Sequence, residues 1–322
     1  MNKDNWRPSA SIERLKNRAI ILATVRHFFS ERNVLEVETP LLARYSVTDP
    51  HMDVLTADNP LAEAQRFYLQ TSPEYAMKRL LAAGSGAIYQ ISKAFRRGEQ
   101  GSRHNPEFTL LEWYRPGFDH FELMDEVAEL VVTVLDCNEK FQRLSYREVF
   151  QHYLDIDPLL VDCEQLQKIA RSHTDIQLES DNRDDWLNVL LAEIIEPKLG
   201  VDAPTFIYNY PASQAALAKI STDKNNALVA QRFELYVSGI ELANGYFELT
   251  NTAEQKKRFQ QDQKQRKSLG QTEIESDAYL LSAMESGLPS CAGVALGVDR
   301  LVMLAQGARS IADVLAFPVD RI

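Results

Sequence analysis

The spacing of apolar residues changes along the chain from a helical period to a strand period and back. Ile12, Leu15, Leu22 and Phe29 fall on one side of a helix, so we expect a helix over residues 9–32. The stretch VLEVETP then predicts a short strand that Pro40 ends. RFYLQTSP predicts another strand, and EYAMKRLLAAG predicts a helix closed by a glycine.

Two alternating stretches follow, over residues 87–96 and 107–115, and a polar loop of ten residues joins them. Residues 141–199 have an acidic, helical pattern, which we interpret as an insertion between halves of a sheet in a single domain of residues 1–322. Other elements are expected as helices at 119–137 and 253–267, strands at 204–211, 232–239 and 240–250, and a strand followed by a helix in 291–307. Hairpin-like loops join most strands, so the pattern predicts an antiparallel sheet flanked by helices, of the α+β class.

Composition excludes several functions. The 322 residues carry a formal net charge of -11, which argues against a nucleic-acid binder that depends mainly on electrostatics. The cysteines form no CxxC pair and the histidines no HExxH pattern, so we expect neither a disulfide framework nor a zinc site, in keeping with the cytoplasm. The chain begins with no signal-peptide pattern, and no apolar run approaches about 18 residues, so we expect no membrane span.

The polar loop lies between strands that each have one apolar face. On the second strand Phe108, Leu110, Glu112 and Tyr114 share a face, and the residues between them share the other. The loop adds five polar side chains: Arg97, Glu99, Arg103, His104 and Asn105. Arginine suits a carboxylate or a phosphate because its planar fork donates hydrogen bonds in pairs. A solvated hairpin whose charges pair among themselves is the alternative.

The stretch FRRGEQGSRHNPEFTLLEWY resembles motif 2 of the class II aminoacyl-tRNA synthetases, most closely of the lysyl-tRNA synthetase branch. The resemblance implies that Arg96 is the catalytic residue and bridges the amino-acid carboxylate and the α-phosphate of ATP. It implies that His104 lies near the terminal phosphates, that Asn105 contacts adenine and that Phe108 stacks beneath it. It also implies that Glu112 and Tyr114 belong to the substrate site.

One position departs from motif 2. The family usually has a glutamate where this sequence has Gly98, and the neighbouring Glu99 is the candidate to replace it in the ATP site.

Two further stretches resemble the other signatures of the same family. RNVLEVETPLL resembles motif 1, which forms the dimer interface and therefore implies a homodimer. GVALGVDRL resembles motif 3, in which Gly293 and Gly297 would let a ligand or backbone come close and Arg300 would cover the other face of adenine. Ala295 stands where the family has a glycine beside the amino acid, so its methyl group should change which amino acid fits.

Glu234, Glu241 and Glu248 recur seven residues apart around an expected two-residue turn at 238–239. With that turn Tyr236 would pair with Glu241, and Glu234 with Ala243. Glu234 and Glu241 would then share a face and could both reach a cation such as Mg²⁺. Glu248 joins that face only if an extra residue intervenes, and residues 244–245 could form either such a bulge or a hairpin turn.

The resemblance assigns roles to these residues. It assigns Glu234 and Glu241 to the metal, Glu241 and Leu242 to ATP, and Glu248 with Tyr114 to the distal ammonium of the substrate. Three exposed strand carboxylates are the alternative.

The stretch TSPEY matches the same family. Taken alone it predicts a turn that starts a helix, with Glu74 in the first turn. The resemblance implies that Ser72 lines the substrate pocket and that Glu74 takes the amino group of the substrate. An acidic pocket of Glu74, Glu248 and Tyr114 suits a molecule with two ammonium groups and one carboxylate, such as lysine or an isomer of it.

Motif 1 begins almost at residue 10, which leaves no room for the anticodon-binding barrel of a lysyl-tRNA synthetase. WRPSASI, YPASQAALAKIS and GIELANG complete a resemblance to the elongation factor P lysine ligase family. Its members activate lysine, by preference (R)-β-lysine, and attach it to a lysine ε-amine of elongation factor P. The resemblance implies ATP and Mg²⁺ as cofactors and elongation factor P, rather than tRNA, as the acceptor.

Two other functions stay open from the sequence. A shortened synthetase would still charge tRNA, and a non-catalytic module would bind an amino acid or nucleotide without reacting. Gly98 favours the module, whereas Arg96 and Arg300 argue against it. A basic run could also dock an acidic partner, although we favour a solvated helix face for its residues, Lys256, Lys257, Arg258, Lys264, Arg266 and Lys267.

Overall fold

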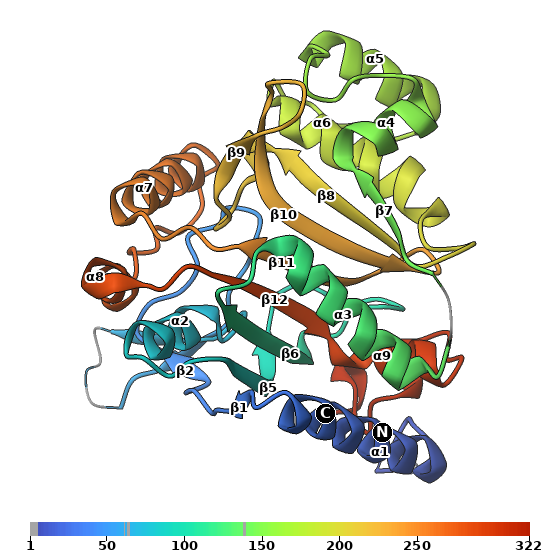
Figure 1. Cartoon of the computed structure of the whole chain (residues 1–322), viewed down its shortest axis with the longest axis vertical. Helices are drawn as coiled ribbons and strands as arrows, with labels where there is room; N and C mark the ends of the chain where they lie inside the picture. Colours follow the sequence, from blue (N-terminus) through green and yellow to red (C-terminus); the bar gives the residue numbers. More distant parts are fainter. Residues whose placement is uncertain (1–5, 61, 63–64, 138–139) are drawn as a thin grey trace. The chain divides into compact units, whose positions relative to one another are not determined.

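The computed structural model describes residues 6–60, 62, 65–137 and 140–322, and the chain divides into two compact units (Figure 1). Unit 1 comprises Met1–Gly117, Thr133–Asp136 and Leu249–Ile322. Unit 2 comprises Phe118–Val132 and Cys137–Glu248. The helical segment predicted as an insertion therefore belongs to the same unit as the strands that follow it.

Unit 1 is built on strands in the order β1 (Leu35–Glu36), β5 (Ile88–Phe95), β6 (Glu107–Pro116) and β12 (Cys291–Gly297). β1 runs parallel to β5, and the other neighbours are antiparallel. A smaller antiparallel sheet has the order β2 (Leu42–Ala43), β4 (Arg66–Leu69), β3 (Thr56–Asp58). The helices of the unit are α1 (Ile12–Glu31), α2 (Glu74–Ala82), α7 (Thr252–Ser268), α8 (Ala278–Gly287) and α9 (Val298–Ala305).

Helix α1 confirms the first predicted element and shows what holds it. Ser11 begins the helix, because its hydroxyl accepts the backbone N–H of Arg14 at 3.2 Å. The ring of Phe29 stacks on Tyr89 of β5 with centroids 4.4 Å apart and meets Trp113 of β6 edge-on. All three rings are buried, and each contributes about 2–3 kcal/mol by leaving water. Trp113 thus lies on the core face of β6, opposite the predicted ligand face.

Unit 2 is built on β7 (Gln142–Ser145), β8 (Thr205–Pro211), β9 (Ile220–Thr222), β10 (Leu228–Val237) and β11 (Ile240–Phe247). Their order is β11-β10-β8-β7, β9 pairs with β10, and only β7 and β8 are parallel. The helices are α4 (Tyr146–Leu154), α5 (Cys163–His173) and α6 (Arg183–Leu190), with most of α3 (His120–Leu135). The aromatic rings of Tyr146, Phe150 and Trp186 lie in one apolar core with Tyr210 and Tyr236 of the sheet.

Two sequence predictions need correction. VLEVETP forms only the two-residue β1, and the segment predicted to be helical from residue 141 begins with β7. β7 has four residues, too few for an alternating pattern to stand out, and it is a strand because it pairs with β8. Pairing partners far away in the chain therefore decide such short elements.

No helix among the described residues is both long and apolar enough to cross a membrane.

Candidate functional site

Cross-strand pairing builds one face of the sheet in unit 1. Glu112 pairs with Gln90 on β5 and with Ala295 on β12, and Tyr114 pairs with Gly293. Paired residues present their side chains on the same face of a sheet, so the predicted face of β6 continues across three strands. The β12 positions carry a methyl group and a hydrogen, so they leave space beside the carboxylate and the phenol.

Glu112 is the buried acid of this face, with 2% of its surface exposed. Ser72 donates its hydroxyl to Oε2 at 2.6 Å, and Tyr114 donates its hydroxyl to Oε1 at 2.7 Å. The structure thus brings together three of the predicted substrate residues. A buried carboxylate is a strong acceptor, so Glu112 suits an ammonium group of a ligand.

Glu74 begins α2 as predicted, and its backbone N–H donates to the hydroxyl of Ser72 at 3.0 Å. Its carboxylate accepts from the ammonium of Lys78 at 2.6 Å. Lys78 is 2% exposed, which is rare for a lysine and requires a charged partner. Sequence reasoning missed Lys78, although the four-residue spacing from Glu74 on a helix was a signal for it.

Gln90 of β5 lies on the same face of the sheet as Glu112, because the two residues are paired across the strands. It is 2% exposed and pairs across the strands with Glu112. Its side-chain oxygen Oε1 is buried without a hydrogen-bond partner among the described residues. A buried acceptor of this kind costs free energy unless a ligand donates to it, so Gln90 joins the candidate site.

The departure at Gly98 has a structural explanation. Gly98 has a φ of 80°, in the left-handed region that glycine adopts readily, and the turn brings Glu99 back toward Arg96. The Oε1 atom of Glu99 lies 3.5 Å from Nη1 of Arg96. Arg96 also lies over the ring of Phe108, with Cζ 5.1 Å from the centroid, and its Nε is buried without a partner among the described residues.

His104 and Arg300 meet at the same loop. Nη2 of Arg300 lies 2.6 Å from Nε2 of His104. Burial, then the charge of Arg300 and more weakly those of Arg96 and Arg103, lower the pKa of His104, while Glu99 opposes them. A neutral imidazole can accept a hydrogen bond from the guanidinium, and the surrounding arginines make the loop attractive to an anion.

Asn105 is held at both ends by the main chain. Its Nδ2 donates to the carbonyl of Glu107 at 2.6 Å, and its Oδ1 accepts the N–H of Val319 at 2.9 Å. The remaining amide hydrogen could still reach a base, so contact with adenine stays a prediction. Gly297 ends β12 and is the N-terminal cap of α9, which starts the helix that carries Arg300.

The hairpin in unit 2 confirms the turn and corrects the register. Val237 pairs with Ile240, and Ser238 and Gly239 both have positive φ. Tyr236 pairs with Glu241 as predicted, but Glu234 pairs with Asn244 and not with Ala243. The extra residue is Leu242, so the bulge at 244–245 was misplaced. An inserted residue reverses the alternation, so Glu241 and Asn244 lie on the same face as Glu234.

Glu234 is 6% exposed and accepts from four side chains. Oε2 accepts the hydroxyls of Tyr210 and Tyr236, both at 2.6 Å. Oε1 accepts from Arg232 at 2.5 Å and from Asn244 at 2.8 Å. These donors occupy its acceptor sites, so a metal ion at Glu234 would require one donor to withdraw.

No group of three or more histidine, cysteine, aspartate or glutamate side chains in the described part of the chain is placed to hold a metal ion. Mg²⁺ is often held by only one or two carboxylates together with phosphates and water, and Glu234 and Glu241 could supply those. Glu248, the third of these acids, follows β11, is 1% exposed and forms a β-bridge with Ala218.

The basic run on α7 is partly used within unit 1. Lys256 pairs with Glu285 at 2.6 Å, and Arg258 pairs with Glu254 at 3.1 Å. Arg266 is buried and donates to the carbonyls of Thr272 and Asp49. These contacts favour the ordinary helix face over a docking surface.

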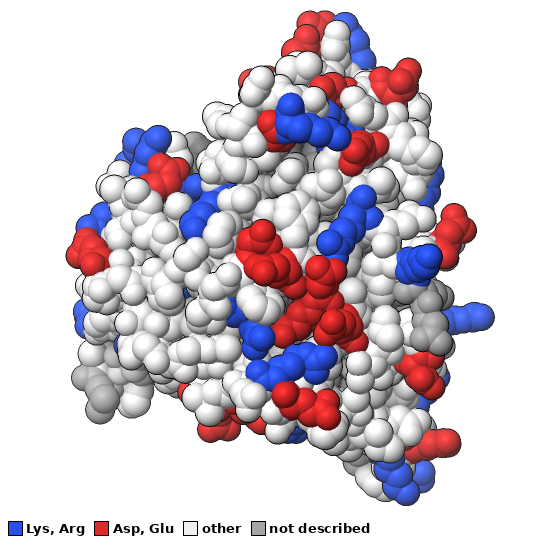
Figure 2. Space-filling model, in the orientation of Figure 1, with Lys and Arg blue, Asp and Glu red and all other residues white. Residues whose placement is uncertain are grey.

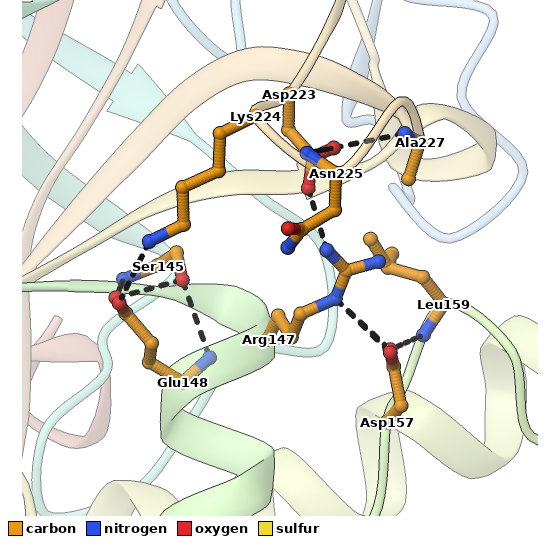
Figure 3. Close-up of polar contacts among 9 residues, drawn as sticks. All are labelled: Ser145, Arg147, Glu148, Asp157, Leu159, Asp223, Lys224, Asn225 and Ala227. Carbon is orange, nitrogen blue, oxygen red and sulfur yellow. Dashed lines mark hydrogen bonds and ion pairs between the residues drawn. The ribbon is translucent and has the colours of Figure 1, made fainter.

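Unit 2 also has a cavity of about 390 Å³ that contains none of the predicted site residues. Arg147 lies beside it between two carboxylates, with Nε 3.1 Å from Asp157 and Nη1 2.7 Å from Asp223 (Figure 3). Asp223 also accepts two backbone N–H groups of the turn that follows it. Arg147 lies on α4, so this network joins the turn after Asp223 to α4 and to Asp157, which follows that helix.

The family model for class II tRNA synthetases (D, K and N) matches residues 4–321. Curated proteins match over nearly their whole length. The elongation factor P–(R)-β-lysine ligases of Proteus mirabilis and Yersinia enterocolitica are both 50% identical over 322 residues, and that of Salmonella paratyphi B is 50% identical over 321. Each match covers 98% of this chain and 98% of the relative. The chain therefore has the class II synthetase catalytic fold and belongs to the family of elongation factor P–(R)-β-lysine ligases.

Proposed function

We propose that the protein is an ATP-dependent ligase that adenylates a lysine, by preference (R)-β-lysine, and transfers it to a lysine ε-amine of elongation factor P. One observation carries the proposal beyond the names of the relatives. A single face of the sheet in unit 1 combines a guanidinium N–H of Arg96, buried without a hydrogen-bond partner in the described part of the chain, with a buried carboxylate at Glu112. Such a face suits a molecule that is anionic at one end and cationic at the other.

In the first step an oxygen of the substrate carboxylate attacks the α-phosphorus of ATP. The bond from that phosphorus to the bridging oxygen breaks, pyrophosphate leaves, and an acyl-adenylate forms. Arg96 stabilises the charge that develops on the α-phosphate, because its N–H donors are already in place. Glu99 orients Arg96, while His104 and Arg300 bind the terminal phosphates and the base. Glu241 and Glu234 would hold Mg²⁺, which would supply positive charge to offset that of a bound phosphate.

In the second step a neutral lysine amine of the partner attacks the carbonyl carbon of the acyl-adenylate. The bond from that carbon to the phosphate oxygen breaks, AMP leaves, and an amide forms while the amine loses a proton. We assign no side chain as the base for this proton.

Substrate choice rests on acidic groups. Glu112, held by Ser72 and Tyr114, would bind the distal ammonium, and Glu74 the other amino group. Gln90 can accept from the same molecule. Ala295 pairs with Glu112, and its methyl group leaves less space beside the amino acid than a glycine would. This difference supports discrimination between lysine isomers.

A homodimer is part of the proposal. Helix α1 and the motif 1 stretch that follows it expose apolar side chains, among them Ile20 at 63% and Leu35 at 56%. Leu42 of β2 is exposed as well. Exposed apolar groups in adjacent segments mark an interaction surface more often than isolated ones do. We place the enzyme in the cytoplasm, where its three free thiols would stay reduced.

Electrostatics disfavours tRNA as the acceptor. The net charge is -11, and Figure 2 shows acidic side chains gathered over α3 on the face in view. Glu122, Asp125 and Glu129 of that helix are exposed. A surface of this charge repels phosphate backbones.

One acceptor assay tests the proposal. Purified protein is incubated with ATP and (R)-β-lysine or lysine, together with either elongation factor P or total tRNA, and both acceptors are analysed by mass spectrometry. We expect one added lysyl mass on one lysine of elongation factor P and none on tRNA. Stable acyl-tRNA with unmodified protein would establish a tRNA-charging enzyme instead, and absence of any adenylate would establish a binding module.

A further inference from the structure

Three side chains from distant parts of unit 1 form a closed set of contacts. Asp299, in the first turn of α9, has Oδ1 2.6 Å from Nη1 of Arg18 on α1. Its Oδ2 accepts the backbone N–H of Thr109 on β6 at 2.7 Å. Arg18 completes the ring, because its Nη2 donates to Oγ1 of Thr109 at 2.9 Å. We call Arg18, Asp299 and Thr109 the α1–α9 clamp.

The clamp replaces a backbone contact that the sheet cannot supply. The pairing of β12 with β6 ends at Gly297 opposite Leu110, because the chain then turns into α9. Thr109 precedes Leu110 on β6, so its N–H would have no partner on the β12 side. The carboxylate of Asp299 takes this donor, and its charge is favourable in the first turn of a helix.

The neighbours of the clamp give it a consequence for the site. Phe108 precedes Thr109, and Arg300 follows Asp299. In the proposed function these two residues cover opposite faces of adenine. We propose that Asp299 and Arg18 are positioning residues that fix the spacing of Phe108 and Arg300, and so pre-form the adenine slot. This inference rests on the proposed function.

Burial makes the clamp rigid. The side chains of Asp299 and Arg18 are 3% and 15% exposed, and one carboxylate oxygen accepts a hydrogen bond while the other is in ion-pair contact with Arg18. A buried aspartate with both oxygens engaged has little freedom to change rotamer, so the strand and the helix cannot shift independently at this point. Another ion pair of the same helix, between Arg26 and Glu36 of β1, is exposed, with 49% and 40% of the two side chains accessible.

The test uses steady-state kinetics of the full-length enzyme together with direct ATP binding. We expect Asp299→Asn and Arg18→Met to raise the KM for ATP by about 10- to 100-fold, the scale of a misplaced binding group. The KM for the amino acid and kcat should change little. Arg18→Lys should restore part of the loss, and Thr109→Val, which keeps the backbone contact, should cost only about threefold.

The matched control is Arg147→Met, which breaks an arginine–aspartate network of unit 2. It should lower the unfolding temperature as much as Arg18→Met does and leave the KM for ATP unchanged. The double variant Arg18→Met/Asp299→Asn should bind ATP no more weakly than the worse single variant, because the two residues act as a unit.

Two results would overturn the clamp. One is a KM for ATP that stays at the wild-type value in Asp299→Asn and Arg18→Met while stability falls as in the control. The other is an equal rise in the KM values for ATP and for the amino acid. Calorimetry with ATP alone separates this failure from failure of the proposed function. If the wild type binds ATP but forms no adenylate, the reaction is wrong, and the binding of ATP to Asp299→Asn still decides the positioning role.

Discussion

Each unit contains an arginine held between polar partners, and the two arginines differ in what they hold. Arg18 of unit 1 and Arg147 of unit 2 are 15% and 12% exposed, and each pairs with buried or half-buried aspartate. Arg147 fastens a turn that contains no candidate site residue. Arg18 fastens the backbone next to Phe108 and the helix of Arg300. An ion pair alone does not show whether an arginine supports the candidate site or only the fold. The residues next to its contacts in the sequence do, and only Arg18 has site residues there.

One histidine in each unit shows the same difference between a residue of the candidate site and a residue of the fold. The pKa of His104 is lowered by burial and by three arginines, which a bound anion would offset. The pKa of His120 is lowered to about 4 by burial, with no arginine among the causes. Both rings are neutral at pH 7, yet only the first should respond to a ligand. Variants of residues in the two units test this difference.

The largest effect should come from Arg96, whose Nε is buried without a hydrogen-bond partner among the described residues. Arg96→Ala should lower the rate of adenylate formation by about 10³-fold, because it removes donors aimed at the developing charge. Rapid-quench measurement of AMP formation would show this. The neighbouring exposed Arg97, changed to alanine, is the control and should lose less than about threefold. Equal losses in the two variants would mean that general charge, and not Arg96, drives the step.

Acid should destabilise the protein through His120. Its folded pKa of about 4 is below the ordinary value, so the unfolded chain takes up the proton first as the pH falls. Stability is therefore unaffected above about pH 6.5 and decreases by up to about 3 kcal/mol as the pH falls to 4. His120→Gln should flatten this part of the pH profile of urea unfolding. An unchanged profile would remove His120 as the cause.

Breaking the network of unit 2 should affect stability alone. Arg147→Met leaves two aspartates without their cation and should cost about 2 kcal/mol in the free energy of unfolding. Urea unfolding measures the loss, and pyrophosphate-exchange kinetics should show an unchanged KM for ATP. A raised KM for ATP would erase the contrast between the two arginine networks.

The smallest effect should be a pH dependence of ATP binding. A polyphosphate beside His104 adds negative charge, so its pKa should rise on binding and the complex should take up a proton. Affinity for ATP should therefore increase a few-fold as the pH falls from 8 to 6, which calorimetry in buffers of different ionisation enthalpy would detect. His104→Gln should abolish the proton uptake. Equal uptake in that variant would assign the proton to another group.

Local pattern predicted the parts of the site that lie on regular strands. The alternation of β6 placed Glu112 and Tyr114 on one face with Phe108, and the pairing of β5, β6 and β12 agrees. The two-residue turn at Ser238 and Gly239 was also correct. The alternation of side chains along a strand and the residues that favour a tight turn both depend on a few neighbouring residues, so the sequence alone predicts them.

Long-range contacts set the rest. The bulge at Leu242 does not alter the pattern of apolar residues in the sequence. An extra residue was therefore considered at 244–245, two positions too late, although its effect on which side chains share a face was foreseen. The pairing of Glu99 with Arg96 depends on the left-handed turn at Gly98. The clamp joins residues from α1, β6 and α9, and no local pattern relates Arg18 to Asp299.

The central claim is that ATP and a diamino acid react on this chain. Amino-acid-dependent exchange of pyrophosphate into ATP tests it most directly, with (R)-β-lysine, lysine and norleucine, which has the carbon chain of lysine without the distal ammonium. The account predicts exchange with the two diamino acids, faster with (R)-β-lysine, and none above background with norleucine. Exchange that is equal with norleucine, or absent with all three, would contradict it.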